Sequence, residues 1–184
     1  MWRQPHRQSM GSPAFVGGLT PEQVEQFVID YFGLTPNTKQ TIGVAYDATT
    51  HKGNRVEIKT DAASTTTGNY FLETLQTFND WQTSKPSGVS LSFQQADFLA
   101  FLNHTQLIIV PTTKLKQWLS LQVALGRVKT RYCRRGTNGN KLGWSTKGYL
   151  APVAEVTKLA VARYECEAAF TPEWTFKPTE QGGS

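Results

Sequence analysis

The stretch Arg55-Val56-Glu57-Ile58-Lys59-Thr60 alternates polar and apolar side chains, and Asp47 precedes it by a short polar segment. A period of two predicts a strand, on which Glu57 and Lys59 point to the same face. Two carboxylates and a lysine at one spot suit metal-assisted cleavage of a phosphodiester, because the carboxylates hold a hard divalent cation and the lysine positions or activates the attacking water. Asp47, Glu57 and Lys59 are therefore the candidate catalytic group.

The residues around Asp47 predict an antiparallel hairpin. Residues 40–46 are rich in β-branched and aromatic residues, which predicts a strand that ends at Asp47. The polar loop 48–54 then leads into the next strand. Asp47 and Glu57 would then lie on neighbouring strands and could share a cation with the Ile58 carbonyl and with water. The alternative is a plain surface strand with cross-strand charge pairs.

The rest of the chain predicts further helices and strands. Thr20-Pro21-Glu22 is typical of a helix start, and Gly33 and Pro36 end that helix. Strands on a mixed central sheet with helices on both sides make an α/β layered domain. Residue patterns predict strands at 70–75, 105–110 and 127–133 and helices at 90–102 and 111–124, while residues 150–159 fit either type.

Length and composition predict one sizeable domain. A chain of 184 residues can bury a real core. A composition of 39% hydrophobic and 18% charged residues argues against global disorder. We expect a flexible N-terminal arm at residues 1–18, a single domain at 19–170 with a basic segment at 114–147, and a flexible C-terminal tail at 171–184.

The cysteines and the hydropathy favour a cytoplasmic protein. Cys133 and Cys166 fit no zinc spacing, and a disulfide framework is not expected. The sequence contains no run of about 18 apolar residues, so we expect no membrane span. Met1-Trp2-Arg3-Gln4-Pro5-His6 lacks the apolar core of a signal peptide.

The charged residues are distributed unevenly along the chain. The formal net charge is +5 and the pI is about 9.3, which favours a polyanionic partner. Not one Asp or Glu occurs from Phe98 to Ala154, a segment that includes Lys147. A nucleic-acid enzyme has this asymmetry when metal carboxylates and phosphate contacts lie in different places, and a solvated basic face is the alternative. The candidate DNA contacts here are Lys114, Lys116, Arg127, Lys129, Arg131, Arg134, Arg135 and Lys141.

The order of these motifs carries a family resemblance. Asp-x9-Glu-x-Lys on consecutive strands after a helix resembles the PD-(D/E)xK nuclease superfamily, which includes type II restriction enzymes, Holliday-junction resolvases and many phage nucleases. Tyr46 stands where the family name has Pro, a departure that leaves the metal ligand in place. Small, mostly phage-encoded members are similar in three strings: Glu57-Ile58-Lys59-Thr60-Asp61, Thr67-Gly68-Asn69-Tyr70-Phe71-Leu72-Glu73, and Lys85-Pro86-Ser87-Gly88 leading to Ala96-Asp97-Phe98.

The resemblance implies a restriction-endonuclease-like αβββαβ core, a mixed central sheet flanked by helices, that binds Mg²⁺ or Mn²⁺. Asp47 and Glu57 would be metal ligands and Lys59 the catalytic lysine. Many members add an acid from the first helix. Glu25 lies at the edge of that helix's apolar arc and is preferred to Glu22, although an acid near a helix N-terminus also complements the helix dipole.

Four further residues are candidates for supporting roles. Glu73 follows on the next predicted strand and could reach the same face as Glu57. Asp61 would share that face on a continuing strand, or it could cap the following loop. Lys85 and Ser87 lie in a loop before a predicted helix, where they could contact phosphate, and an ordinary helix cap is the alternative.

These features predict a Mg²⁺-dependent DNA endonuclease, phage- or bacterium-encoded, in which the cation lowers the pKa of the attacking water. Two alternatives stay open: a non-catalytic DNA-binding protein that keeps the basic segment, and an RNA-processing nuclease of the same fold. A homodimer also stays open, because cutting both strands usually needs two active sites.

Overall fold

The structure, a computed structural model, describes residues 19–38, 44–78, 84–135, 144–167 and 175–179. Within these ranges the chain forms two β-sheets with helices packed against them. The mixed α/β architecture predicted from the sequence is therefore confirmed.

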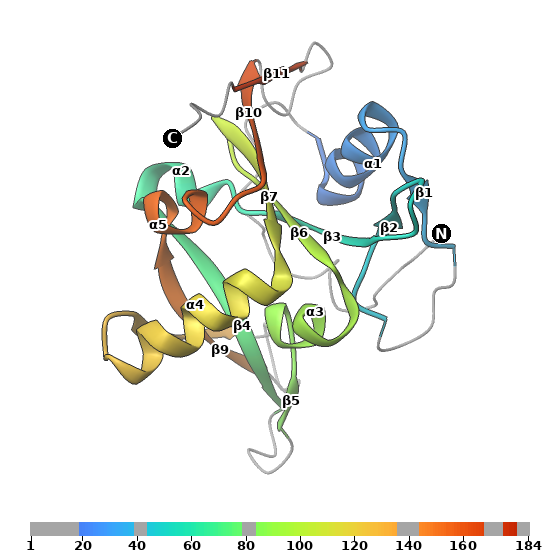
Figure 1. The fold of residues 1–184 in the computed structure, drawn as a ribbon. Helices are drawn as coiled ribbons and strands as arrows, with labels where there is room; N and C mark the ends of the chain where they lie inside the picture. The colour runs from blue at the N-terminus through green and yellow to red at the C-terminus, as the bar shows by residue number, and fades with distance from the viewer. Residues whose placement is uncertain (1–18, 39–43, 79–83, 136–143, 168–174, 180–184) are drawn as a thin grey trace.

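The larger sheet has seven strands in the order β1-β2-β3-β6-β7-β10-β11 (Figure 1). β3 and β6 pair in parallel, and the other neighbours pair antiparallel. A parallel pair needs a long crossover, which here includes two strands of the second sheet. The bounds are β1 (Thr35–Pro36), β2 (Ala48–Thr49), β3 (Arg55–Thr60), β6 (Phe98–Leu102), β7 (Gln106–Pro111), β10 (Ala162–Glu167) and β11 (Thr175–Pro178).

Helix α1 (Pro21–Tyr31) covers one face of the larger sheet. Its N-terminus is a capping box, in which Thr20 Oγ1 accepts a bond from the Gln23 N–H at 3.3 Å and Gln23 Oε1 accepts one from the Thr20 N–H at 2.8 Å. Val24 and Val28 are buried in the core beneath β3. The predicted helix start is therefore confirmed.

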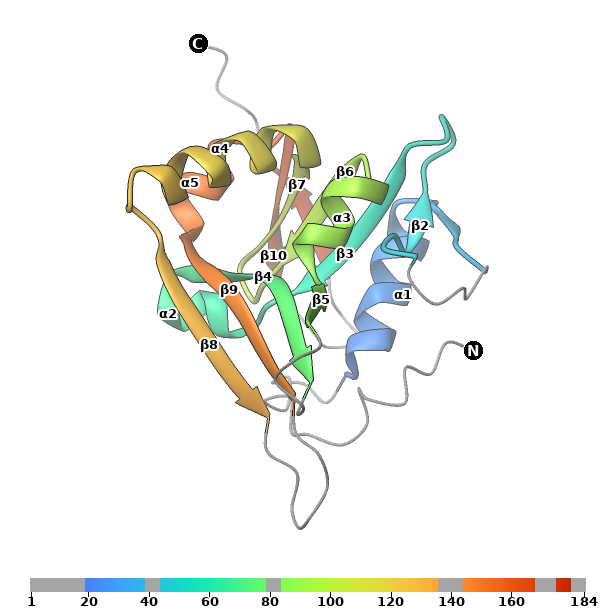
Figure 2. The same cartoon turned by 90° about the horizontal axis from the view of Figure 1, so that it is seen from below.

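The second sheet has four antiparallel strands in the order β5-β4-β9-β8. Figure 2 shows β4, β9 and β8 side by side, on the opposite side of the molecule from α1. A β-bulge interrupts the pairing of β4 with β9 between Glu73 and Leu75. The bounds are β4 (Asn69–Phe78), β5 (Ser84–Pro86), β8 (Lys129–Arg135) and β9 (Trp144–Pro152).

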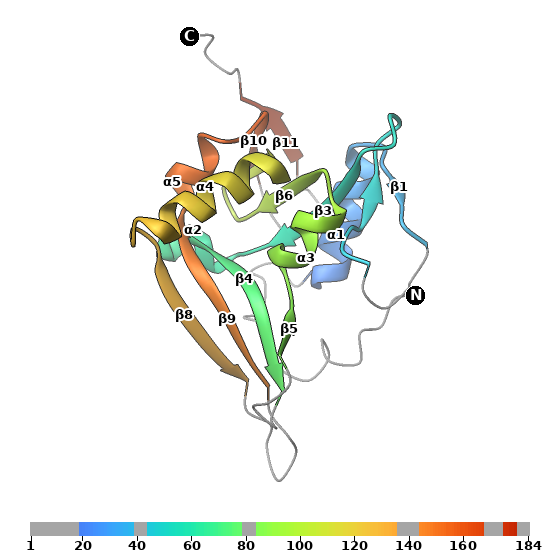
Figure 3. The same ribbon diagram turned by 60° about the horizontal axis from the view of Figure 1, so that its bottom comes forward.

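A second core lies on the face of the larger sheet opposite α1. It combines Tyr70 and Leu72 of β4 with Leu99 of β6, Ile108 of β7 and Leu115 of helix α4 (Thr112–Ala124), all fully or almost fully buried. Burial of each aliphatic side chain contributes roughly 1.5–3 kcal/mol. Figure 3 shows α3 and α4 in front of β6. The helices concerned are α2 (Ala63–Thr67), α3 (Val89–Gln95), α4 (Thr112–Ala124) and α5 (Val153–Thr157).

The predicted helix at residues 90–102 is wrong in its second half. Helix α3 ends at Gln95, and Ala96 is extended with φ −102° and ψ 146°. Phe98–Leu102 is instead the central strand β6, in which four of five residues are buried. A short, fully apolar run satisfies helix and strand periodicity equally, and burial on both faces of the sheet decides for the strand.

The predicted strand at residues 40–46 is also corrected. Residues 39–43 lie outside the described part, and residues 44–46 form no strand. The strand that pairs with β3 is β2, which begins directly after Asp47. The antiparallel hairpin itself is confirmed, with Ala48 opposite Val56.

The predicted third strand exists but joins a different sheet. Residues 70–75 lie within β4, the second strand of the smaller sheet, so the order αβββαβ does not occur within one sheet in the form expected. Residues 105–110 and 111–124 match β7 and α4 closely. Residues 127–133 overlap β8, and residues 150–159 combine the end of β9 with α5.

The C-terminal segment differs from the expected flexible tail at 171–184. Thr175–Pro178 forms β11, which pairs with β10 at the edge of the larger sheet. Phe176 of this strand is only 4% exposed and belongs to the core under α1. The domain therefore extends beyond residue 170, whereas residues 1–18 lie outside the described part. No helix in the described ranges is long and apolar enough to cross a membrane.

Candidate active site

Strand β3 presents Glu57 and Lys59 on one face of the larger sheet. The parallel register sets Glu57 opposite Leu99 and Lys59 opposite Phe101, which both point into the second core. Ile58, between them, points to the opposite core under α1. The sequence prediction that Glu57 and Lys59 share a face is therefore confirmed.

Glu57 is a buried carboxylate with a lysine partner. Its residue is only 7% exposed, and burial of an unpaired charge would be costly. The Lys59 ammonium forms an ion pair with Glu57 Oε1 and a hydrogen bond to the same oxygen. The Lys59 side chain is 26% exposed, so this charge pair connects a buried carboxylate to the surface.

Asp47 contacts the same strand from its edge. Its Oδ2 atom accepts a hydrogen bond from the Ile58 N–H at 2.7 Å, and its own N–H donates to the Val56 carbonyl at 2.9 Å. β2 pairs with β3 only at Arg55 and Val56. The Asp47 side chain therefore occupies the edge of β3 beyond the last residue pair of the hairpin.

The Ile58 carbonyl faces the same edge as Asp47. In a strand, the N–H and C=O of one residue point to the same side, and the N–H of Ile58 is directed at Asp47. The edge of β3 thus offers two kinds of oxygen, a carboxylate from Asp47 and a backbone carbonyl from Ile58, close to the Glu57 face of the strand.

Negative charge accumulates around Asp47. Burial raises the pKa of the Asp47 carboxyl well above its usual range, and the charges of Glu57 and Glu25 raise it further. Lys59 and the Ile58 N–H act in the opposite direction. The helix acid that reaches Asp47 electrostatically is Glu25, which is half-buried on α1, whereas Glu22 is exposed.

The oxygen donors of this cluster suit a hard divalent cation. Mg²⁺ prefers one or two carboxylates and completes its shell with other oxygens and water, and Asp47, Glu57 and the Ile58 carbonyl supply such a set. The crowding of carboxylates at Asp47 is a charge imbalance that a cation would relieve. In the described ranges, no three His, Cys, Asp or Glu side chains form a group that could hold a metal. Backbone oxygen and water would therefore have to complete the shell.

Glu73 and Ser87 pair with each other. Glu73 lies on β4 of the second sheet, and its Oε1 atom accepts a hydrogen bond from the Ser87 hydroxyl. The Ser87 N–H donates to the Thr74 carbonyl at 3.1 Å. These bonds fix the start of α3 on β4. Glu73 thus lies on a different sheet from Glu57, and its supporting role at the site stays a prediction.

Asp61 performs the capping role that was the alternative prediction. Its Oδ1 atom accepts from the Ser64 N–H at 3.1 Å and its Oδ2 atom from the Phe71 N–H at 3.0 Å. Burial raises the pKa of the Asp61 carboxyl. Its two oxygens thus hold α2 and the first residues of strand β4 together, which is a structural role.

The predicted DNA contacts occupy three places. Lys114 and Lys116 are exposed on α4, and Lys85 is exposed on β5. Exposed residues at and near β8, the outer strand of the second sheet, are Arg127, Lys129 and Arg131. Arg134 and Arg135 are the last two residues of β8, and their side chains lie outside the described part of the structure. Lys141 lies wholly outside it.

Two contacts that support the site were missed in the sequence. The Asp97 carboxylate accepts from the Arg55 N–H at 2.8 Å and from its guanidinium at 3.3 Å, which ties the first residue of β3 to the start of β6. The Gln95 side chain accepts from the Ala45 N–H at 2.8 Å and holds the segment before Asp47. The sequence signal for this role of Asp97 is its position directly before the apolar run of β6.

Comparisons of the chain with protein-family models, with curated proteins and with solved structures found no match.

Proposed function

We propose that this protein is a Mg²⁺-dependent endonuclease that hydrolyses DNA phosphodiester bonds on a restriction-endonuclease-like core. The observation that carries the proposal is the bond from the Ile58 N–H to Asp47 Oδ2 at 2.7 Å, beside the Glu57–Lys59 ion pair. It joins the separate parts of the sequence motif at one edge of β3. The arrangement of α1, the β2–β3 hairpin, the α3 crossover and the parallel strand β6 resembles the core of the PD-(D/E)xK superfamily.

Asp47, Glu57 and the Ile58 carbonyl would hold the cation. When bound, Mg²⁺ would lower the pKa of a water molecule and offset the charge of the scissile phosphate. The protein's part is to bind and orient. Asp47 is held in place by the Ile58 N–H, and Glu57 is held by its position in a buried strand.

Lys59 would act on the reacting phosphate. Its ammonium rests on Glu57, and the partly exposed side chain can turn from that carboxylate toward a phosphate at the surface. There it would orient the attacking water and stabilise the negative charge that develops on the phosphate oxygens. Water forms the new P–O bond, and the bond from phosphorus to the leaving oxygen breaks. Glu25 adds negative charge on the α1 side, where it would orient water.

The basic residues outside the cluster would bind the DNA backbone. Lys114 and Lys116 on α4 and Lys129 and Arg131 on β8 are exposed and lie in the acid-free half of the sequence. Such contacts position a duplex or a strand without reading its sequence, and they make affinity fall with salt. Cleavage of both strands would require two active sites, for which a homodimer is one solution.

The test is nicking of supercoiled plasmid in Mg²⁺, Mn²⁺ or EDTA. Glu57→Gln and Lys59→Met each remove one partner of the buried ion pair and should lower the nicking rate about 100-fold or more. Glu155→Gln and Lys158→Met are matched controls, because they remove an exposed ion pair of the same chemistry, 2.6 Å between Nζ and Oε1, on α5. These controls should nick at the parent rate.

Two results would reject the endonuclease. Salt-sensitive DNA binding without metal-dependent nicking would make the chain a non-catalytic DNA-binding protein. Cleavage of a labelled RNA, with plasmid left intact, would make it an RNA nuclease with the same catalytic group.

A further inference from the structure

One face of the second sheet carries a row of side chains that the proposed catalysis does not use. The register sets Tyr132 of β8 opposite Lys147 of β9, Lys147 opposite Leu75 of β4, and Leu75 opposite Pro86 of β5. Residues directly opposite one another point to the same face of a sheet. The row therefore runs across all four strands, on the same face of the sheet as the buried side chain of Leu72.

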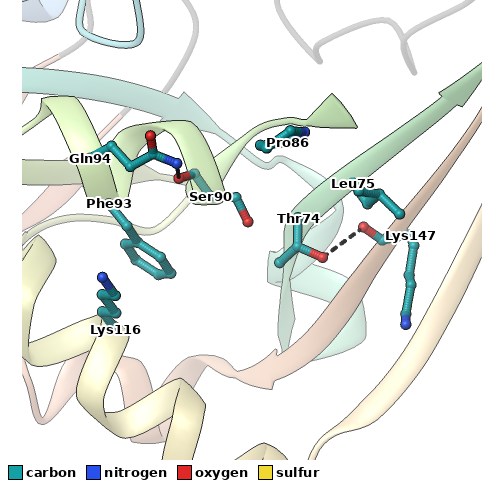
Figure 4. A pocket seen from close by; sticks show the side chains of 8 residues that line it. All are labelled: Thr74, Leu75, Pro86, Ser90, Phe93, Gln94, Lys116 and Lys147. Atoms are coloured by element: carbon teal, nitrogen blue, oxygen red, sulfur yellow. Dashed lines mark hydrogen bonds between the residues drawn. The ribbon is translucent and has the colours of Figure 1, made fainter. Parts of the chain in front are cut away.

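A groove of about 480 Å³ lies between this row and the helices. Leu75 and Lys147 line it from the sheet, Phe93 from α3 and Lys116 from α4. Figure 4 shows the Phe93 ring and the Lys116 side chain on one side of the groove and Leu75 and Lys147 on the other. Its described lining combines apolar surface with two lysines and contains no carboxylate.

Tyr132 extends the groove with an exposed aromatic ring. The residue is 66% exposed, and the Lys147 ammonium lies 6.0 Å from the centre of its ring. A flat ring beside a lysine offers a stacking surface for a base together with a positive charge for a phosphate. Neither Tyr132 nor Lys147 is among the DNA contacts predicted from the sequence.

We infer that this groove and Tyr132 bind an unpaired nucleic-acid strand, with a base stacked on Tyr132 and phosphates at Lys116 and Lys147. The inference rests on the proposed function and names its substrate class, a DNA with a single-stranded portion. The faces of the bases are hidden inside a duplex and become available to a protein ring only in an unpaired strand. Charge complementarity favours this occupant, because the groove and the neighbouring β8 carry positive charge.

A second copy of the chain fits this surface less well. Although β8 is an edge strand of its sheet, it carries the exposed cations Lys129 and Arg131. Edge-to-edge pairing of two such strands would bring like charges together, which is a known means of preventing strand addition. The same cations attract a polyanion.

The experiment measures binding in EDTA, where cleavage is absent, by fluorescence anisotropy of the full chain. The probes are a labelled oligo(dT), an abasic strand of the same length and a duplex of the same length. Tyr132→Ala should weaken oligo(dT) binding about five- to 150-fold, the range for loss of one stacked base, and leave the abasic strand unchanged. Tyr132→Phe keeps the ring and should bind like the parent. Lys147→Met should weaken both single strands, while Lys158→Met, which removes an equal charge on α5, should change neither.

Three outcomes would overturn the inference: equal binding of oligo(dT) by Tyr132→Ala and the parent, equal affinity for the abasic strand and oligo(dT), or tighter binding of the duplex. Displacement of oligo(dT) by polyglutamate as readily as by unlabelled oligo(dT) would assign the groove to acidic polypeptides instead. Plasmid nicking measured in parallel separates the two proposals. If Tyr132→Ala binds oligo(dT) as tightly as the parent while Mg²⁺-dependent nicking is intact, only the groove proposal is rejected. If Tyr132→Ala weakens oligo(dT) binding while the parent does not nick plasmid, only the nuclease proposal is rejected.

Discussion

Asp47 and Ile58 are joined by a hydrogen bond of 2.7 Å from the Ile58 N–H to Asp47 Oδ2. This bond replaces the next rung of the β2–β3 ladder, since β2 pairs with β3 only at Arg55 and Val56. A side chain takes the place of a backbone partner, and a carboxylate is thereby fixed beside the Glu57–Lys59 pair.

Asp47→Asn should stabilise the metal-free protein. The pKa of Asp47 is raised by burial and by Glu57 and Glu25, so the charged form is unfavourable in the folded state at neutral pH. Asparagine removes that charge and can still accept from Ile58. We expect the melting temperature in EDTA at pH 7 to rise by a few degrees, while Mg²⁺-dependent nicking is lost. Scanning fluorimetry measures the first effect, and an unchanged or lower melting temperature would contradict the charge imbalance.

The difference in melting temperature between Asp47→Asn and the parent should depend on pH with a definite sign. A pKa raised on folding contributes stability that is present below the unfolded value near 3.8 and is lost as pH rises through the folded pKa. The stabilising effect of Asp47→Asn should therefore shrink as pH falls toward 4 and reach its full size above the folded pKa. A difference that stays constant across this range would mean that the charge of Asp47 is not the cause.

Mg²⁺ should raise the melting temperature of the parent protein. A ligand that binds only the folded state stabilises it by about 1.4 kcal/mol at a concentration tenfold above its Kd, which raises the melting temperature by about 3–6 °C for a chain of this size. Glu57→Gln should abolish this shift, because it removes a metal ligand, whereas Glu155→Gln should keep it. A shift of the same size in both variants would place the metal elsewhere.

Asp97→Asn should lower the stability of the folded protein. The pH dependence of this effect should have the opposite sign to that of Asp47→Asn. The Arg55 guanidinium and its backbone N–H lower the pKa of Asp97. A lowered pKa contributes stability that is present above the unfolded value and is lost as pH falls through the folded pKa. The parent should therefore exceed Asp97→Asn in melting temperature at pH 7 and lose that advantage below about pH 4. The effect is modest, since both side chains are about 40% exposed.

Gly88→Ala should destabilise the start of α3. Gly88 has a φ of +51°, and an added Cβ would lie 2.6 Å from the Glu73 carbonyl oxygen. Strain of this kind costs on the order of 1–3 kcal/mol. Gly53→Ala is an informative comparison, because its φ of +81° is also strained while its Cβ would meet no atom within 4 Å. Equal melting temperatures for the two variants would show that the contact with Glu73 adds nothing.

The local motifs were predictable from sequence where short-range chemistry determines them. The capping residues of α1, the alternation of Glu57 and Lys59, and the end of α4 at Ala124 depend on neighbours in the chain. The hairpin that brings Asp47 to β3 was also predictable, although its first strand, β2, follows Asp47 instead of ending before it.

The sheet to which each strand belongs was not predictable. The sequence predicts β4 beside β3 because it follows next in the chain, yet β4 pairs with β9, from Asn69 opposite Pro152 to Phe78 opposite Trp144. The apolar run at β6 was assigned to a helix, because a short run that is buried on both faces has no diagnostic period. The error at β4 explains why the sequence predicts Glu73 on the strand next to Glu57.

The assignment of the catalytic group is tested by the rate at which Lys59→Met and Lys158→Met nick supercoiled plasmid in Mg²⁺, with oligonucleotide binding by both variants measured in EDTA. Each variant removes one lysine from an ion pair with a glutamate, buried in the first and exposed in the second. We expect nicking to fall about 100-fold or more for Lys59→Met alone, and DNA binding to be retained in both variants. Equal nicking rates for the two variants would contradict the assignment of Asp47, Glu57 and Lys59 as the catalytic group.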